Sequence, residues 1–409
     1  MTRAGRAQAV LAGVVALQLV AETALTPYWP LVFRRLFGLD ELAATGSFLT
    51  VCRVVGLAAL PLWGLAALRW PVRNLLVAGL LGCSVFDLAL AVAPTWWLFT
   101  ASSAAVVACG AVLVLAYPAL VALVERDGRA PRRTAVVTFW AVFHTAAVLS
   151  TLIGATIVAL SEPRWGLAAF AVVDLGLAVL VWTALPAGAP TRRAAETLGQ
   201  AVGTRAERWH RLRPWLVLVV AVVAVDAAIA VPRPFLVELL VRDGVDATTA
   251  GWLFLAPAVA SLAVLPAASP LHRRLGGRCA PLAAGAAAAG LLGQAAAVAL
   301  GEPWWFLLCR LLFGAGTGVL LVVLDLAVFA RVGTTGAAFS AVETGRAAAL
   351  LAAPVIATAV AGHWLGAPLV TGAVLLFAAA VLLTRDVPHT EPDHHDDSQE
   401  TEHVLDPVR

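Results

Sequence analysis

Several ionisable side chains of this 409-residue chain lie inside long apolar segments, where they could bind a proton or a solute. An ionisable group at the centre of a lipid bilayer costs roughly 2.5–3.5 kcal/mol on insertion scales, so it normally faces a cavity or a partner. We therefore predict that such residues form a proton-coupling or substrate site. The candidates are Glu22, Arg53, Asp87, His144, Asp226, Arg310 and Asp325.

Glu22 is the leading candidate because it lies near the middle of the first apolar segment. A carboxyl group in this setting can take up and release a proton, which coupling to a proton gradient requires. Its negative charge could also attract a cationic substrate. The alternative is a fixed salt bridge, for which Arg53 is the candidate partner.

The other candidates have more than one interpretation. Asp226 and Arg233 are two helical turns apart, so they share a helix face and could pair, serve in gating or contact substrate. Arg310 could hold an anionic substrate group or an aspartate. His144 could titrate in the physiological range, although hydrogen-bonded packing is the commoner role for one histidine in a helix. No local partner is evident for Asp87.

Composition identifies the elements that must position these residues. The chain is 61% hydrophobic and 13% charged, whereas soluble domains are about 45–50% apolar and about 25% charged. Its apolar runs are continuous rather than alternating, which favours membrane-spanning helices over a barrel. We predict an all-α membrane protein with twelve spans. The expected spans are 8–33, 44–67, 73–93, 95–124, 134–160, 165–186, 214–238, 248–269, 279–300, 303–330, 337–361 and 364–384.

The longest polar break divides the spans six and six. We predict a first six-helix bundle over 1–186, a linker over 187–213, a second bundle over 214–385 and a disordered acidic tail over 386–409 that contains histidines. With the N-terminus inside, arginines gather in the inner loops, so the positive-inside rule predicts that both termini are cytoplasmic. The protein should cross the cell membrane many times.

The two predicted bundles look like repeats. Trp96 and Trp97 open the fourth span as Trp304 and Trp305 open the tenth. The first span ends in Pro30…Gly38-Leu-Asp40…Gly46, and the seventh ends in Pro234…Gly244-Val-Asp246…Gly251. We interpret this agreement as pseudo-symmetry between two six-helix halves.

A short basic motif follows the second span. Gly64-Leu-Ala-Ala-Leu68-Arg69-Trp70-Pro71-Val72-Arg73 resembles the motif that the major facilitator superfamily carries between helices two and three. Leu68 replaces the motif's Asp, and Pro71 replaces its second Gly. Arg273-Arg274-Leu275-Gly276-Gly277-Arg278 repeats part of the pattern in the second half. The resemblance implies gating roles. The gating candidates are Gly64, Arg69, Arg73, Arg233, Arg274, Gly276 and Arg278.

Two further motifs resemble the twelve-helix drug/proton antiporters of that superfamily. Arg310-Leu-Leu-Phe-Gly314-Ala-Gly316-Thr-Gly318 is similar to a motif that drug exporters place in helix four, although here it lies in span ten. Pro27-Tyr28-Trp29-Pro30 is similar to the end of their first helix. The Gly- and Pro-rich antiporter motif of helix five is absent from 141–158.

We therefore expect a secondary active transporter and no enzyme. The predicted activity is proton-coupled export of a small hydrophobic or cationic compound, such as a drug or secondary metabolite, by alternating access. An importer or facilitator of a small polar solute and a lipid transporter of the same fold are the alternatives. The expected partners are the substrate, protons and the lipid bilayer, with no nucleic acid, metal or cofactor, and we expect a monomer.

Overall fold

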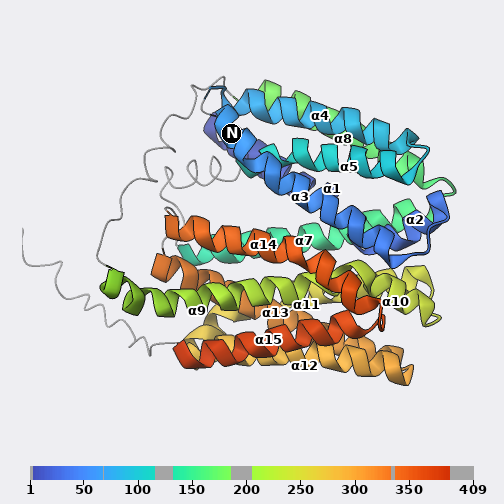
Figure 1. Ribbon diagram of the computed structural model, residues 1–409. Helices are drawn as coiled ribbons and strands as arrows, with labels where there is room; N and C mark the ends of the chain where they lie inside the picture. Colours follow the sequence, from blue (N-terminus) through green and yellow to red (C-terminus); the bar gives the residue numbers. More distant parts are fainter. Residues whose placement is uncertain (1–2, 68, 116–131, 186–204, 333–336, 387–409) are drawn as a thin grey trace, which may run out of the picture.

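The chain folds into two packed groups of long helices, shown in Figure 1. The computed structural model describes residues 3–67, 69–115, 132–185, 205–332 and 337–386, and no strand occurs within these ranges. The elements of the first half are α1 (Arg3–Ala24), η1 (Thr26–Tyr28), α2 (Trp29–Phe37), α3 (Leu42–Ala67), α4 (Val72–Val92), α5 (Trp96–Gly110), η2 (Ala111–Leu115), α7 (Arg132–Ala159) and α8 (Pro163–Ala184).

The second half repeats this order of elements. It contains α9 (Arg205–Ala230), η5 (Arg233–Phe235), α10 (Leu236–Arg242), α11 (Ala247–Leu275), η6 (Gly276–Arg278), α12 (Cys279–Leu300), α13 (Pro303–Val332), α14 (Ala337–Ala361) and α15 (Ala367–Asp386). Helix α9 begins at Arg205, inside the segment predicted as the linker.

Ten segments of the described residues are long and apolar enough to cross a membrane. One of them, 247–300, contains both α11 and α12. The protein is therefore a multi-pass membrane protein, and the count of twelve spans stays a prediction. Large apolar side chains such as Val92 and Trp304 are more than three-quarters exposed, as expected where lipid is the solvent.

The predicted first span, 8–33, is not one continuous helix. Helix α1 ends at Ala24, and the 3-10 turn η1 separates it from α2. Pro27 at the start of η1 and Pro30 at the start of α2 have no N–H to donate to a continuing helix. The corresponding break in the second half is η5, which contains Pro234.

Close helix contacts recur at equivalent places in the two halves. A Cβ atom on Gly82 of α4 would clash with the Sγ atom of Cys109 on α5, and one on Gly293 of α12 would clash with that of Cys309 on α13. Residues with no side chain allow both helix pairs to approach closely. This match agrees with the internal repeat expected from the sequence.

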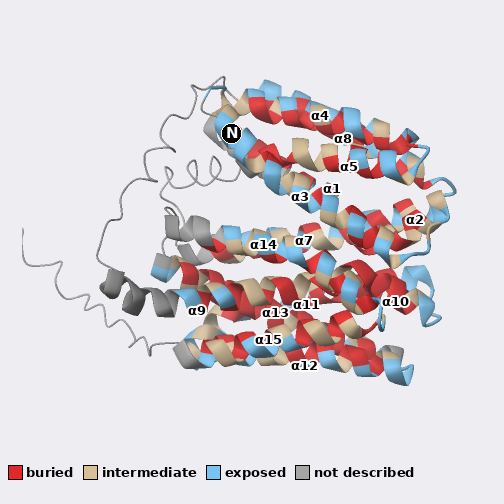
Figure 2. Cartoon of the chain, in the orientation of Figure 1, coloured by how far each residue is buried: buried red, intermediate tan, exposed pale blue. Residues whose placement is uncertain are grey.

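The halves meet along two helix pairs. Helix α7 packs against α1 of its own half and α11 of the other, and α3 packs against α14. Figure 1 shows α2 and α10 together at one end of the molecule, here called the α2–α10 end. Figure 2 shows buried residues concentrated through the second half and around α2 and α10.

Candidate functional site: charged residues between the two halves

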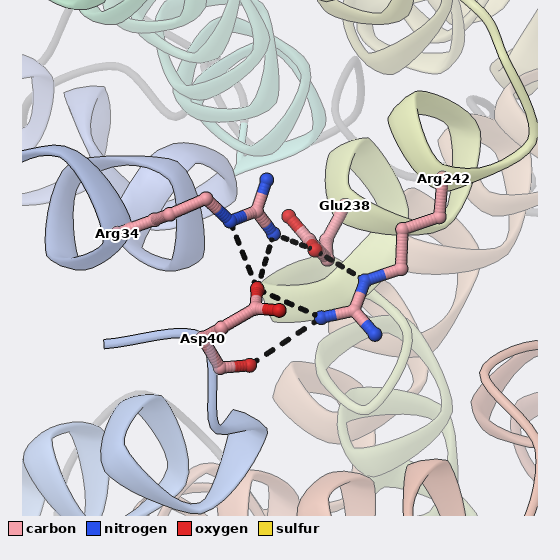
Figure 3. A network of polar contacts seen from close by, with 4 residues as sticks. All are labelled: Arg34, Asp40, Glu238 and Arg242. Atoms are coloured by element: carbon pink, nitrogen blue, oxygen red, sulfur yellow. Dashed lines mark hydrogen bonds and ion pairs between the residues drawn. The ribbon is translucent and has the colours of Figure 1, made fainter. Parts of the chain in front are cut away.

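Four charged residues join the halves at the α2–α10 end, as Figure 3 shows. Arg34 of α2 binds the Glu238 carboxylate of α10 and lies 2.8 Å from Asp40 Oδ1. Arg242 of α10 lies 2.6 Å from Glu238 and 3.2 Å from Asp40. We call Arg34, Asp40, Glu238 and Arg242 the interface network. Each acid contacts one arginine from each half.

The interface network is balanced in charge but not in exposure. The Glu238 side chain is fully buried, whereas that of Asp40 is 67% exposed and those of Arg34 and Arg242 are 38% and 43% exposed. Water can therefore solvate three of its four members when the halves separate, which keeps the cost of opening this end low.

A second charged cluster lies deeper, within the helices of the second half. The Arg346 guanidinium of α14 lies 2.5 Å from Asp325 of α13 and 3.5 Å from Asp226 of α9. These side chains are between 9% and 18% exposed. We call Asp226, Asp325 and Arg346 the carboxylate–arginine cluster. It brings together two residues that were predicted as site candidates from separate spans.

Trp140 connects this cluster to the first half. Its indole Nε1–H on α7 donates a hydrogen bond of 2.9 Å to Oδ2 of Asp325. Among the described side chains, two carboxylates share one guanidinium here. A proton on Asp325 would reduce the negative charge of this set and weaken a contact between the halves.

Arg53, His144 and Arg233 lie near each other at the interface. Arg53 of α3 and Arg233 of η5 are close enough to repel each other electrostatically, and His144 of α7 lies within range of Arg233. His144 is 7% exposed, and its Nε2 atom has no hydrogen-bond partner among the described residues. We call these three residues the cationic cluster.

Asp226 and Arg233 were expected to share a helix face and could have paired. The structure instead pairs Asp226 with Arg346, because the break at η5 ends the α9 helix before Arg233.

Arg310 is held by neutral oxygen atoms. Its guanidinium donates to the carbonyls of Leu253 and Phe254 on α11 and to the side-chain oxygen of Gln294 on α12. Its arrangement ties α11, α12 and α13 together inside the second half. The glycines that follow it pack closely: a Cβ on Gly314 would overlap the backbone of Pro257.

Asp87 has a partner that the sequence did not reveal. Its side chain on α4 lies close to that of Asp174 on α8, and both residues are buried. Two carboxyl groups can share a hydrogen bond only when one of them carries a proton. This pair is therefore a place in the first half where a proton could be held.

The gating candidates of the basic motif are at the opposite end from α2 and α10. Arg69, Arg274 and Arg278 are exposed, and none of them has an ion pair with any side chain that the structure describes. Arg73 lies 4.4 Å above the Trp182 ring. Gly64 has open space around its Cα.

Gly276 adopts a φ of 52°, which favours glycine, at the turn between α11 and η6. Together with His272 and Arg331 it lines a pocket with an empty volume of about 490 Å³. This pocket lies within the second half, apart from the three charged clusters.

Glu22 lies in α1, but its side chain is outside the described residues, so its predicted role stays a prediction. Sequence reasoning missed the interface network altogether. Two features of the sequence could have indicated this network: the i,i+4 spacing of Glu238 and Arg242, and the repeat that relates α2 to α10. It also missed Trp140 as a polar partner of Asp325 and Asp174 as the partner of Asp87.

The described part of the chain therefore has two helical halves that meet at ion pairs, with ionisable groups inside apolar helices. Residues 218–407 match the Major Facilitator Superfamily, a family of transporters. The fold is similar to that of a bacterial homologue of the iron transporter ferroportin in its inward-facing state, with a TM-score of 0.66 and 16% sequence identity. That match covers 93% of this chain and 98% of the other.

The family match confirms the resemblance to the major facilitator superfamily in the second half, and the solved structure shows a similar fold along the chain. The resemblance to drug/proton antiporters stays a prediction. No curated protein matches the chain. Among the described residues, no group of three or more His, Cys, Asp or Glu side chains is arranged to hold a metal ion.

Proposed function

We propose that the chain is a proton-coupled secondary active transporter that works by alternating access in the cell membrane. The observation that carries this proposal is the carboxylate–arginine cluster, in which two carboxylates share one guanidinium and one of them accepts a hydrogen bond from the other half. Proton binding at this cluster changes both its charge and a contact between the halves, which is the link that coupling requires.

The proton would act on Asp325. When Asp325 is ionised, it accepts from Trp140 and pairs with Arg346, so α7, α13 and α14 are held together. When Asp325 is protonated, Arg346 retains Asp226 alone and the bond from Trp140 loses its charged acceptor. The contact between α7 and α13 becomes weaker, which favours a rearrangement of the halves.

The interface network would be the gate at the other end. The arginine distribution of the sequence assigns the α2–α10 end to the outside, so in this conformation the outer ends of the halves are held together. Access from the outside then requires separation of Arg34 and Asp40 from Glu238 and Arg242.

Export remains a prediction from the motifs. Arg310 and Gly314, which carry the exporter-like pattern, serve packing within the second half and do not indicate a direction. Import of a polar solute and lipid transport are the alternatives, and the same assay separates them.

The test is proton movement in proteoliposomes that contain the purified protein, followed with a pH-sensitive dye while aromatic anions, cations and neutral compounds are added. We expect at least one compound class to move protons with the wild type and not with Asp325→Asn. Gln18→Asn, which changes a buried amide in α1 and leaves the cluster intact, is the matched control. Solute movement without proton movement would contradict coupling, and movement only of labelled lipid would favour the lipid alternative.

A further inference from the structure

The cationic cluster contains two guanidinium groups that lack an acidic partner within the described part of the chain. Arg53 and Arg233 form no hydrogen bond or ion pair with any described side chain, and they repel each other across the interface. The Nε2 atom of His144, more than nine-tenths buried, is also without a hydrogen-bond partner there. Arg53 and His144 therefore lie within electrostatic range of Arg233, and no described carboxylate pairs with either guanidinium group.

Arg53 faces the other half and not the lipid. It is seven residues after Gly46 in α3, so the two residues lie on the same face of the helix. Gly46 contacts α14, because a Cβ at this position would overlap the Thr358 side chain. Arg53 is nevertheless exposed, and it is eleven residues from the start of α3, roughly 16 Å along the helix. Its guanidinium thus reaches a space between the halves at membrane depth.

The same structure neutralises or saturates its other deep arginines. Arg346 is paired with two carboxylates, and Arg310 donates to three oxygen atoms. Arg53 and Arg233 are the exceptions among the deep arginines of the described ranges. An unpaired guanidinium is costly at this depth and therefore marks a place where a ligand is expected.

We propose that Arg53, His144 and Arg233 form a binding site for a small organic anion with a carboxylate, sulfonate or phosphate group. Guanidinium groups hold such anions with charge-assisted hydrogen bonds. Aromatic rings line α7 beside the site, since His144 lies 5.8 Å from Trp140 and 5.6 Å from Phe143 between ring centroids, so the anion should carry an apolar body. This inference deepens the proposed function, on which it rests, and replaces the cationic substrate expected from the sequence.

The anion would also connect the two halves. Arg53 belongs to α3 of the first half and Arg233 to η5 of the second, so one bound anion would cancel the repulsion between them. Binding would then favour the conformation in which both arginines reach the ligand, which is the differential affinity that alternating access needs.

The test compares two permanently charged probes of similar size, benzenesulfonate and benzyltrimethylammonium, by isothermal titration calorimetry on the protein in phosphatidylcholine nanodiscs. We expect benzenesulfonate to bind at least tenfold more tightly. Arg53→Gln and Arg233→Gln should each weaken its binding about tenfold or more, whereas Arg53→Lys, which retains the charge, should lose less. Arg164→Gln is the matched control, because Arg164 lies at the start of α8, donates to the backbone carbonyls of Ala91 and Ala93, and lies over the Phe37 ring.

Glu22→Gln provides a second test, because Glu22 is the candidate counter-ion of Arg53. An unchanged or higher affinity for benzenesulfonate supports the anion site, and a loss contradicts it. Phosphatidylglycerol is then added to the nanodiscs. If it lowers the affinity of the wild type for benzenesulfonate but does not lower that of Arg53→Gln, a lipid headgroup is the anion that occupies the site. Tighter binding of the cation, or equal binding by wild type and both Gln variants, would overturn the proposal.

These measurements are made at equilibrium and need no transport. Anion binding without coupled proton movement would leave the site intact and refute the proposed function. Proton movement driven only by cations would support the function and refute the anion site. Size-exclusion profiles and melting temperatures of each variant show whether a loss of binding comes from the site or from misfolding.

Discussion

The interface network joins the two halves by ion pairs, and the carboxylate–arginine cluster of the second half contacts the first half through Trp140, but the two differ in balance and in exposure. The network has two acids and two arginines, and three of its side chains are at least 38% exposed. The cluster has two acids and one arginine, all at most 18% exposed. Water can replace the contacts of the network more easily than those of the buried cluster, where a proton would change the balance of charge.

We propose that this difference gives the two regions distinct tasks. A balanced and hydrated set of ion pairs makes a latch that opens at little cost. An unbalanced buried set makes a sensor, because its energy depends on whether a proton is bound. The variants below test this comparison in order of expected effect.

Arg346→Met should have the largest effect. It leaves the carboxylates of Asp226 and Asp325 without their shared cation, and breaking a buried ion pair costs about 3–5 kcal/mol. The free energy of unfolding in detergent micelles, measured by chemical denaturation, should fall by that amount. The triple variant that also carries Asp226→Asn and Asp325→Asn should recover most of the loss. A loss below about 1 kcal/mol for the single variant would mean that the cluster is well hydrated.

Trp140→Phe should come next. It retains the ring on α7 and removes the N–H donor to Asp325, and a hydrogen bond to a charged group contributes about 1.5–3 kcal/mol. We expect weaker proton coupling in proteoliposomes together with reduced stability. Trp182→Phe, which retains a ring beneath Arg73, is the control. Equal effects of the two substitutions would argue against a special role for the bond to Asp325.

Glu238→Gln should have a smaller effect although Glu238 is fully buried. Glutamine retains an acceptor for Arg34 or Arg242, and Asp40 still bridges both arginines. We expect a loss of about 1–2 kcal/mol in the free energy of unfolding. The rate of labelling of a cysteine introduced at position 43, beside the network, should rise as this end opens more often. Unchanged labelling would show that the network is not the latch.

Asp40→Asn should have the smallest effect, about 0.2–1 kcal/mol, because its side chain is 67% exposed. Salt should screen the lost interaction, so the difference from wild type should vanish near 1 M salt. Asp246→Asn, at the repeat-related position, retains an acceptor for the N–H groups of Thr248 and Thr249 and should not alter this salt dependence. A difference that persists in high salt would mean that Asp40 acts through more than its charge.

Much of the fold could be predicted because its causes are local. Continuous apolar runs predict the helices, and the observed bounds of α12 coincide with the predicted span 279–300. The end of helix α11 was harder to predict. The helix continues through Pro257, Pro266 and Pro270 to Leu275, six residues beyond the predicted end. Packing against α13 compensates for hydrogen bonds that the prolines cannot make.

By itself, the sequence determined that the chain is helical, crosses the membrane several times, is internally repeated and carries ionisable groups at membrane depth. Composition, hydropathy and spacing act over a few residues, so they can be read from one segment at a time. Only the tertiary structure decided which charges meet. Arg34 and Glu238 are 204 residues apart, and Asp87 finds Asp174 on another helix, because charge pairing depends on distances in space that no local pattern specifies.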